Sequence, residues 1–339
     1  MTFCLGYDVN RLNDGAGAQL QRILVVEGIA HLLKAGYFHQ DITSIDSNYG
    51  DGLNSLESKR KFIDELNAYL NFKDFSCQHE YHQKINSTLV HKSGALMLPL
   101  LRVYRIILSK RRKNYLLLIQ DPYSVARKKI EVYDCVRNRH KFATQNRKNG
   151  KKVSVKIHLP WAGIGKGQLS DRKISIDWYK SLLGHLDSIL REARYEVVYT
   201  FHTDGIRGLK DDLISLGISE ETRGYWTDKG LLQDKTFNWS YIEIEEEFCF
   251  LENIEIKFGI NAIEVWDDMK VADILVLTKS SLSNIAGLLN FNALKLVSED
   301  VNGMPEDFVK LSEEELKSKS ILQNIIINYL GNDKEISES

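Results

Sequence analysis

The sequence has few of the residues that make linkers, membrane spans or strongly charged surfaces. Only four prolines occur among 339 residues. No Pro-rich or Ser-rich stretch separates its parts, so we expect domains joined by short structured connections. The longest apolar runs, 116–119 and 274–277, have strand length, far below the roughly 18 residues of a membrane span. The formal net charge of −1 excludes a global attraction to nucleic acid.

Cysteines are also scarce. The four that occur are Cys4, Cys77, Cys135 and Cys249. Their spacings form no CxxC-type metal clip, and they are too few for a disulfide framework. We therefore expect reduced thiols in a cytoplasmic protein. The first residues also lack the basic and apolar regions of a signal peptide.

What the sequence does contain is enough chain for two globular domains. At roughly 100–200 residues per domain, its length favours two. Apolar residues make up 43%, which is ordinary for a protein with buried cores. The polar, glycine-containing stretch 147–152 is the best candidate boundary. We therefore predict an N-terminal domain over 1–150 and a C-terminal domain over 151–339.

Helical and extended patterns alternate along the chain. The spacing of apolar residues predicts helices over 18–35, 56–71, 123–143, 177–193, 209–216, 283–289 and 312–330. Short apolar or alternating runs predict strands over 37–39, 115–119, 153–158, 195–201, 272–277 and 294–297. This alternation indicates α/β domains built from parallel βαβ units. We expect the last helix, 312–330, to pack back on the N-terminal domain.

A glycine turn precedes the first helix. Gly15 and Gly17 let backbone N–H groups approach a ligand closely, and a helix N-terminus favours anions. Gln19 belongs to the same turn, but the third glycine of GxGxxG is absent. Asp14, which this turn presents, is the candidate general base. A structural role for Asp14 as a helix cap is the alternative.

Two predicted strands end in polar residues that suit a nucleotide. His158 ends one strand and precedes a glycine-rich loop, where Lys166 or the downstream Arg172 can neutralise a phosphate. Asp204 follows another strand and can accept hydrogen bonds from a ribose or a base. Ligands of open α/β sheets gather at such strand ends. The alternatives are a ligand-free loop around Lys166 and an N-cap role for Asp204.

A third strand end carries a run of hydroxyl groups. The strand over 272–277 is followed by Ser280, Ser281, Ser283 and Asn284, which open a helix. Their side chains, with the N–H groups of the helix, would form a cradle for a diphosphate. Plain helix capping by Ser283 is the alternative. The adjacent carboxylates Asp267 and Asp268 do not form a DxD metal motif, and we expect them at a helix start.

Together these motifs resemble the fucosyltransferase superfamily, in particular its α-1,2 and α-1,6 branches. Asp14–Gln19 stands where the family has its GGLGNQ turn, and His158 ends the strand that carries HxRRGD in the family. The stretch from Ala272-Asp273 to Ser283 matches the later serine-bearing motif. The family's arginine pair is Pro160-Trp161 here, so either Lys166 or Arg172 substitutes, or the donor differs.

The resemblance implies a divergent bacterial or viral-type glycosyltransferase of GT-B fold, with two Rossmann-like domains facing a central cleft. It implies an acceptor side in the N-terminal domain and a nucleotide-sugar site in the C-terminal one. The reaction would need no metal and no cofactor, and would serve polysaccharide biosynthesis. GDP-fucose is one candidate donor, and a glycan or lipid-linked glycan would be the acceptor. Asp14 would be the catalytic base, with His158 as runner-up.

Two other functions fit the same strand ends. One is a phosphate-handling α/β transferase, such as a pyruvyltransferase. The other is a non-catalytic glycan-binding protein, which the Pro160-Trp161 replacement favours. Basic residues at 110–113, 127–129 and 147–152 predict either peripheral contact with anionic lipid or an ordinary solvated surface.

Overall fold

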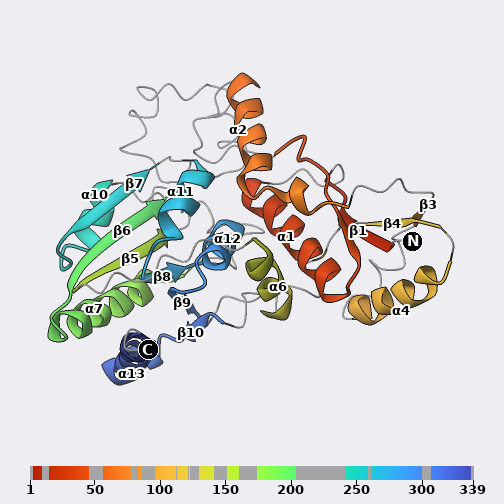
Figure 1. The fold of residues 1–339 in the computed structure, drawn as a ribbon. Coiled ribbons are helices and arrows are strands. Elements are labelled where there is room, and N and C mark those ends of the chain that lie inside the picture. The colour runs from red at the N-terminus through yellow and green to blue at the C-terminus, as the bar shows by residue number, and fades with distance from the viewer. Residues whose placement is uncertain are drawn as a thin grey trace. The chain divides into compact units, whose positions relative to one another are not determined.

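The protein is α/β, and its chain divides into two units that each hold one parallel sheet (Figure 1). The N-terminal unit comprises Met1–Asn48, Leu53–Ala143 and Gly303–Asp307, and the remaining residues form the C-terminal unit. The computed structural model describes residues 3–9, 15–45, 56–77, 83–85, 96–111, 113–120, 122, 130–140, 151–159, 174–203, 241–258, 261–299 and 307–336.

The N-terminal unit has a four-stranded sheet in the order β2-β1-β4-β3, and all its strand pairs are parallel. Its strands are β1 (Phe3–Tyr7), β2 (Gly36–Phe38), β3 (Gln83–Ile85) and β4 (Tyr115–Ile119). Its helices are α1 (Ala16–Leu32), α2 (Leu56–Tyr69), the 3-10 turn η1 (Phe72–Phe75), α4 (Met97–Ser109) and α6 (Ile130–His140).

Helix α1 forms the centre of this unit. Almost all of its side chains are buried, because it packs on β1 and β2 and also against α6. The crossing with α6 depends on Gly28. A Cβ at this position would lie 2.3 Å from the carbonyl oxygen of Val132, so any larger residue would push the two helices apart.

The C-terminal unit has a six-stranded parallel sheet. Its strands are β5 (Lys152–Leu159), β6 (Glu196–Thr203), β7 (Ile254–Phe258), β8 (Ile274–Leu277), β9 (Leu294–Ser298) and β10 (Val309–Leu311). Their spatial order is β10-β9-β8-β5-β6-β7. With β5 counted as the first strand, this reads 3-2-1-4-5-6 from the β7 edge, the strand order of a Rossmann-like doubly wound sheet.

Helices cover both faces of this sheet (Figure 1). They are α7 (Ile176–Glu192), α10 (Tyr241–Glu247), α11 (Ala262–Met269) and α12 (Ser281–Leu289). On one face, the Tyr199 hydroxyl donates to Asp187 of α7 at 3.0 Å. The side chains that alternate with it, Lys156 and His158 among them, point to the opposite face and contact α11 and α12.

The last helix, α13 (Lys319–Ile336), packs against α7 within the C-terminal unit. It starts seven positions later than the residues predicted for it, because the separate 3-10 turn η6 (Glu315–Lys317) comes first, and Ser312 and Glu315 exchange hydrogen bonds at its start. The contact with α7 fixes one side of the helix, and the expected packing on the N-terminal domain stays a prediction. None of the helices within the described ranges is long and apolar enough to cross a membrane.

Candidate functional site

The candidate site lies where the order of the C-terminal sheet reverses. β5 pairs with β6 on one side and with β8 on the other, and all three strands run in the same direction. Their carboxyl ends therefore lie at the same edge of the sheet. In open α/β sheets, this switch point is where ligands bind. His158 and His202 are register partners on β5 and β6 and occupy this edge.

His158 is held by a cluster of hydroxyl groups from the start of α12. Its Nδ1 lies 2.7 Å from Ser283 Oγ, 3.3 Å from Thr278 Oγ1 and 3.4 Å from Ser280 Oγ. These contacts join β5 to the segment after β8, across 125 residues of sequence. Side-chain hydrogen bonds therefore link the end of β5 to the start of α12 at the point where the strand order reverses.

The serine hydroxyls are also fixed from the backbone side. The Ser283 N–H donates to Ser280 Oγ at 3.0 Å, so Ser280 is the N-cap of α12. The Thr278 N–H donates to Ser283 Oγ at 3.1 Å. Each serine oxygen accepts one backbone N–H and can also donate its own proton, and Nδ1 of a neutral His158 ring can accept that proton. The alternative stated above was that Ser283 caps the helix. In the structure the N-cap of α12 is Ser280.

This arrangement fixes the state of His158. Burial lowers the pKa of its imidazole to about 3, with a further contribution from nearby His202, so the ring is neutral at pH 7. Hydroxyl donors at Nδ1 favour the tautomer that carries its proton on Nε2. Nε2 is buried and has no hydrogen-bond partner among the described residues. A buried polar atom normally has a hydrogen-bond partner, so Nε2 marks a position that the described residues leave open.

A buried charge cluster lies behind this edge, on the same face of the sheet. Asp268 of α11 accepts from Lys156 Nζ at 2.8 Å and from His202 Nε2 at 2.8 Å through the same oxygen, Oδ2. Its Oδ1 lies 3.3 Å from Lys257 Nζ. Asp268 therefore joins three neighbouring strands to α11 through one carboxylate.

The ionisation states follow from these contacts. Burial would raise the pKa of the Asp268 carboxyl, but the hydrogen bonds from His202 and Lys156 outweigh it, and the pKa lies well below its ordinary value. Burial lowers the pKa of His202 despite its contact with Asp268, so this ring is neutral too. Its single N–H is used on the carboxylate, which leaves Nδ1 as a buried acceptor with no partner in the described ranges.

The sequence reasoning missed this cluster. Asp267 and Asp268 were expected at a helix start, but they lie in the last turn of α11. The available signal was period-two polarity within apolar strands. Lys156 and His158 stand two apart on β5, as Thr200 and His202 do on β6, so each pair faces the same side.

Of the residues predicted for the C-terminal site, the structure brings together His158, Ser280 and Ser283. Ser281 is the first residue of α12 and is half-buried. Asn284, in the same helix, is buried, and its Oδ1 has no partner among the described residues. The other predicted members, Lys166, Arg172 and Asp204, lie outside the described residues.

The predicted glycine turn is described from Gly15 onward, and Asp14 lies outside the described residues. Gly15 is the N-cap of α1, with no side-chain cap, and Gly17 is half-buried in the first turn. Gln19 is fully buried and accepts a hydrogen bond from the Tyr7 hydroxyl at 2.8 Å. This contact gives Gln19 a structural role, tying α1 to β1.

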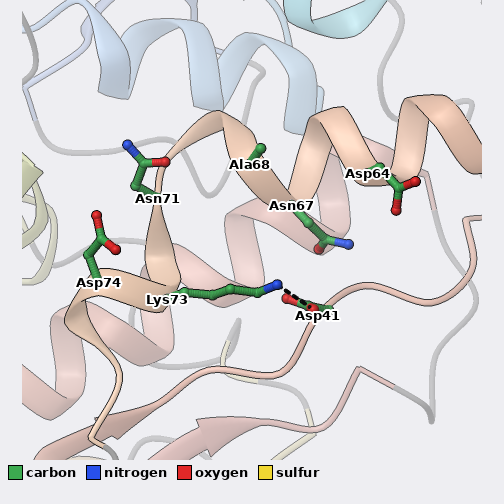
Figure 2. Close-up of a pocket in the computed structure, with 7 residues that line it drawn as sticks. All are labelled: Asp41, Asp64, Asn67, Ala68, Asn71, Lys73 and Asp74. Atoms are coloured by element: carbon green, nitrogen blue, oxygen red, sulfur yellow. Dashed lines mark ion pairs between the residues drawn. The ribbon is translucent and has the colours of Figure 1, made fainter.

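A hollow of about 370 Å³ in the N-terminal unit does not suit a diphosphate (Figure 2). It contains three carboxylates and one lysine, and Lys73 Nζ is paired with Asp41 at 2.8 Å. A net negative lining repels an anion. The lining residues are Asp41, Asp64, Asn67, Ala68, Asn71, Lys73 and Asp74.

No protein-family model, curated protein or solved structure matches the chain. The argument for function therefore starts from the contacts at the edge of the C-terminal sheet.

Proposed function

We propose that the protein is a metal-independent glycosyltransferase whose C-terminal unit binds the diphosphate of a nucleotide-sugar at the switch point between β5 and β8. One observation carries this proposal. The buried Nε2 of His158 has no hydrogen-bond partner among the described residues, and Nδ1 of the same ring contacts Ser283 in the first turn of α12. A phosphate oxygen is the acceptor that this position suits best.

The same edge supplies what the reaction needs. Glycosyl transfer breaks the bond between the sugar and its diphosphate, so negative charge grows on the leaving group. The first N–H groups of α12, on Ser281 and Leu282, have no acceptor within the helix and carry the positive end of its dipole. With the His158 N–H, they would stabilise that charge as it develops.

The proposal extends to the whole chain in the form of a GT-B enzyme. The N-terminal unit would supply the acceptor side, and Asp14 would take the proton from the acceptor hydroxyl. Lys166, Arg172 and Asp204 would complete the donor site, with GDP-fucose as one candidate donor. The acceptor would be a glycan or lipid-linked glycan, and the protein would act in the cytoplasm.

Nucleoside diphosphate binding tests the proposal directly. A titration calorimetry panel of GDP, UDP, TDP and CMP should show one tight binder, and Ser283→Ala should weaken its affinity about tenfold by removing a hydrogen bond. The matched control is Ser312→Ala, a buried serine of the same unit that caps η6. It should leave the affinity unchanged. Wild-type affinity in Ser283→Ala would show that the cradle does not hold the diphosphate.

Turnover assays separate the proposal from its two alternatives. Release of sugar from a nucleotide-sugar supports a glycosyltransferase, whereas turnover of phosphoenolpyruvate would indicate a pyruvyltransferase. Thermal stabilisation by glycans, without any by nucleotides, would indicate a glycan-binding protein.

We also propose that α4 docks on an anionic membrane surface, where a lipid-linked acceptor would be found. Its solvent-facing side carries large apolar residues, namely Leu96, Val103, Ile106 and Ile107. Exposed basic residues accompany them, namely Arg102, Lys110, Arg111 and Lys113. An apolar stripe beside cationic side chains matches the boundary between acyl chains and anionic headgroups.

Liposome sedimentation tests this docking. Ile106→Ser should lower partitioning onto phosphatidylserine-containing vesicles roughly tenfold, because an isoleucine side chain no longer enters the apolar boundary. Ile327→Ser is the control, since Ile327 on α13 is exposed to 53% and Ile106 to 55%. Equal loss in both variants, or a change of oligomeric state without vesicle binding, would contradict docking through α4.

A further inference from the structure

Cys4 and Cys77 lie unusually close to each other. Their Sγ atoms are 2.6 Å apart, although 73 residues separate them in the sequence. No disulfide joins them in the structure, and Cys135 and Cys249 are not in disulfides either. Two unbonded sulfur atoms normally stay well beyond this distance, and a disulfide would need them only about half an ångström closer.

The backbone holds both cysteines in place. Cys4 lies on β1 and is the register partner of Gly36 on β2. The Cys77 N–H donates to the Tyr37 carbonyl oxygen at 2.7 Å. One residue earlier, Ser76 Oγ accepts from the His39 N–H at 3.0 Å. The segment after η1 therefore runs along β2, the edge strand of the sheet, and brings Cys77 to the central strand's Cys4.

We propose that Cys4 and Cys77 form a reversible intramolecular disulfide, with a low-molecular-weight disulfide such as oxidised glutathione as the oxidant. This inference is independent of the glycosyltransferase proposal. The thiolate of one cysteine attacks the oxidant and forms a mixed disulfide, releasing one glutathione thiol. The second cysteine loses its proton and attacks the mixed disulfide, releasing the second glutathione thiol. The two protein thiols are oxidised, and the oxidant is reduced to two thiols.

Burial sets the order of these steps. Cys77 is half-buried, whereas Cys4 is fully buried in the sheet. The oxidant therefore reaches Cys77 first, and Cys4 is the resolving thiol. The other two cysteines serve as internal controls. Burial raises the pKa of the Cys135 thiol, which disfavours its thiolate, and Cys249 lies in the C-terminal unit.

The disulfide would join the segment after η1, which runs along β2, to β1. It would close a long loop within the N-terminal unit. Such a cross-link restricts the unfolded chain. Oxidation should therefore raise the melting temperature of the N-terminal unit by on the order of 10 °C.

Redox titration with mass spectrometry tests the proposal on the full chain. The protein is equilibrated with reduced and oxidised glutathione, unfolded in acid, alkylated and mapped by peptide. Oxidised samples should lose alkylation at Cys4 and Cys77 together, and a cross-linked peptide pair should appear. Cys135 and Cys249 should appear in no cross-linked peptide, although the exposed Cys249 can carry a glutathione adduct. Full alkylation of Cys4 and Cys77 under oxidising conditions, or cross-links to the other two cysteines, would overturn the proposal.

Single variants test the order of attack. Cys4→Ser should accumulate one glutathione adduct at Cys77, because the resolving thiol is absent. Cys77→Ser should gain little adduct at the buried Cys4. The melting temperatures of Cys135→Ser and Cys249→Ser should still rise on oxidation, as in the wild type. If both Cys4→Ser and Cys77→Ser fail to fold, the peptide map of the wild-type protein still decides the question.

Discussion

Asp268→Asn should lower the free energy of unfolding of the C-terminal unit by about 3–5 kcal/mol, the usual cost of leaving a buried charge without its partner. Lys156 is the charge concerned. Its side chain is only 10% exposed, and its ammonium is paired with Asp268 at 2.8 Å. The same change weakens the contacts that His202 and Lys257 make with the carboxylate. Urea unfolding followed by circular dichroism measures the loss.

The neighbouring Asp267 provides a matched control. Asp267 also pairs with a lysine, Lys270, but the two side chains of that pair are 47% and 40% exposed. Exposed pairs contribute about 0–1 kcal/mol. Asp267→Asn should therefore change stability little, although it lies in the same turn of α11. Equal losses in the two variants would show that the buried cluster makes no special contribution.

Acid should remove the stabilisation that Asp268 provides. A carboxylate whose folded pKa lies below its unfolded pKa stabilises the protein above the unfolded value, and this contribution is lost as the pH falls through the folded one. The pKa of Asp268 is lowered in this way by His202 and Lys156. The difference in stability between the wild type and Asp268→Asn should therefore persist at pH 7 and shrink in strong acid.

The fold shows how far local sequence patterns reach. The apolar run 115–119 is β4 over the same residues, and the helical spacing over 177–193 is α7 within one residue. β1, β3, β7 and β10 were not predicted. β3 and β10 have only three residues each, whereas β7 carries a period-two alternation of Ile and charged residues that the sequence reasoning overlooked. The two three-residue strands owe their conformation to pairing with longer neighbours rather than to their own pattern.

In the candidate site, the individual residues could be predicted from the sequence, but their contacts could not. His158 and the serines around 280–283 could each be predicted, because strand ends carry polar residues in α/β sheets. Their contact could not, since it depends on β8 lying beside β5. The link from Lys156 to Asp268 spans 112 residues and likewise follows from strand order. Sequence spacing alone does not encode which strands become neighbours.

Under the proposed function, His158→Ala should lower kcat by about 10²–10³-fold, the range found when one donor to a developing anion is removed. His158→Gln should retain much of the activity, because its amide N–H can reach the position of Nε2. His185→Gln is the control. His185 lies on α7, where its Nε2 contacts the Leu316 carbonyl oxygen at 2.8 Å. This control should keep wild-type turnover with a nucleotide-sugar.

The pH dependence distinguishes a donor from a base. With a pKa of about 3, His158 stays neutral across the working range and is a poor general base near pH 7. The pH profile of kcat/KM should therefore contain no titration near pH 6.5 that depends on His158. The profiles of the wild type and His158→Gln should have the same shape in this range. A titration of this kind, together with equal losses in the Gln and Ala variants, would assign the proton transfer to His158.

Stability should reveal the same neutral imidazole without any assay of turnover. Because the pKa of His158 is lower in the folded chain than its ordinary 6.5, the unfolded state binds more protons below that pH. The neutral His158 ring therefore makes its full contribution to the free energy of unfolding above pH 6.5. This contribution is lost between pH 6.5 and 3, by up to about 1.4 kcal/mol per pH unit. In His158→Gln this slope should be smaller. An unchanged slope would mean that His158 is protonated in the folded protein, and a protonated ring cannot accept the Ser283 proton at Nδ1.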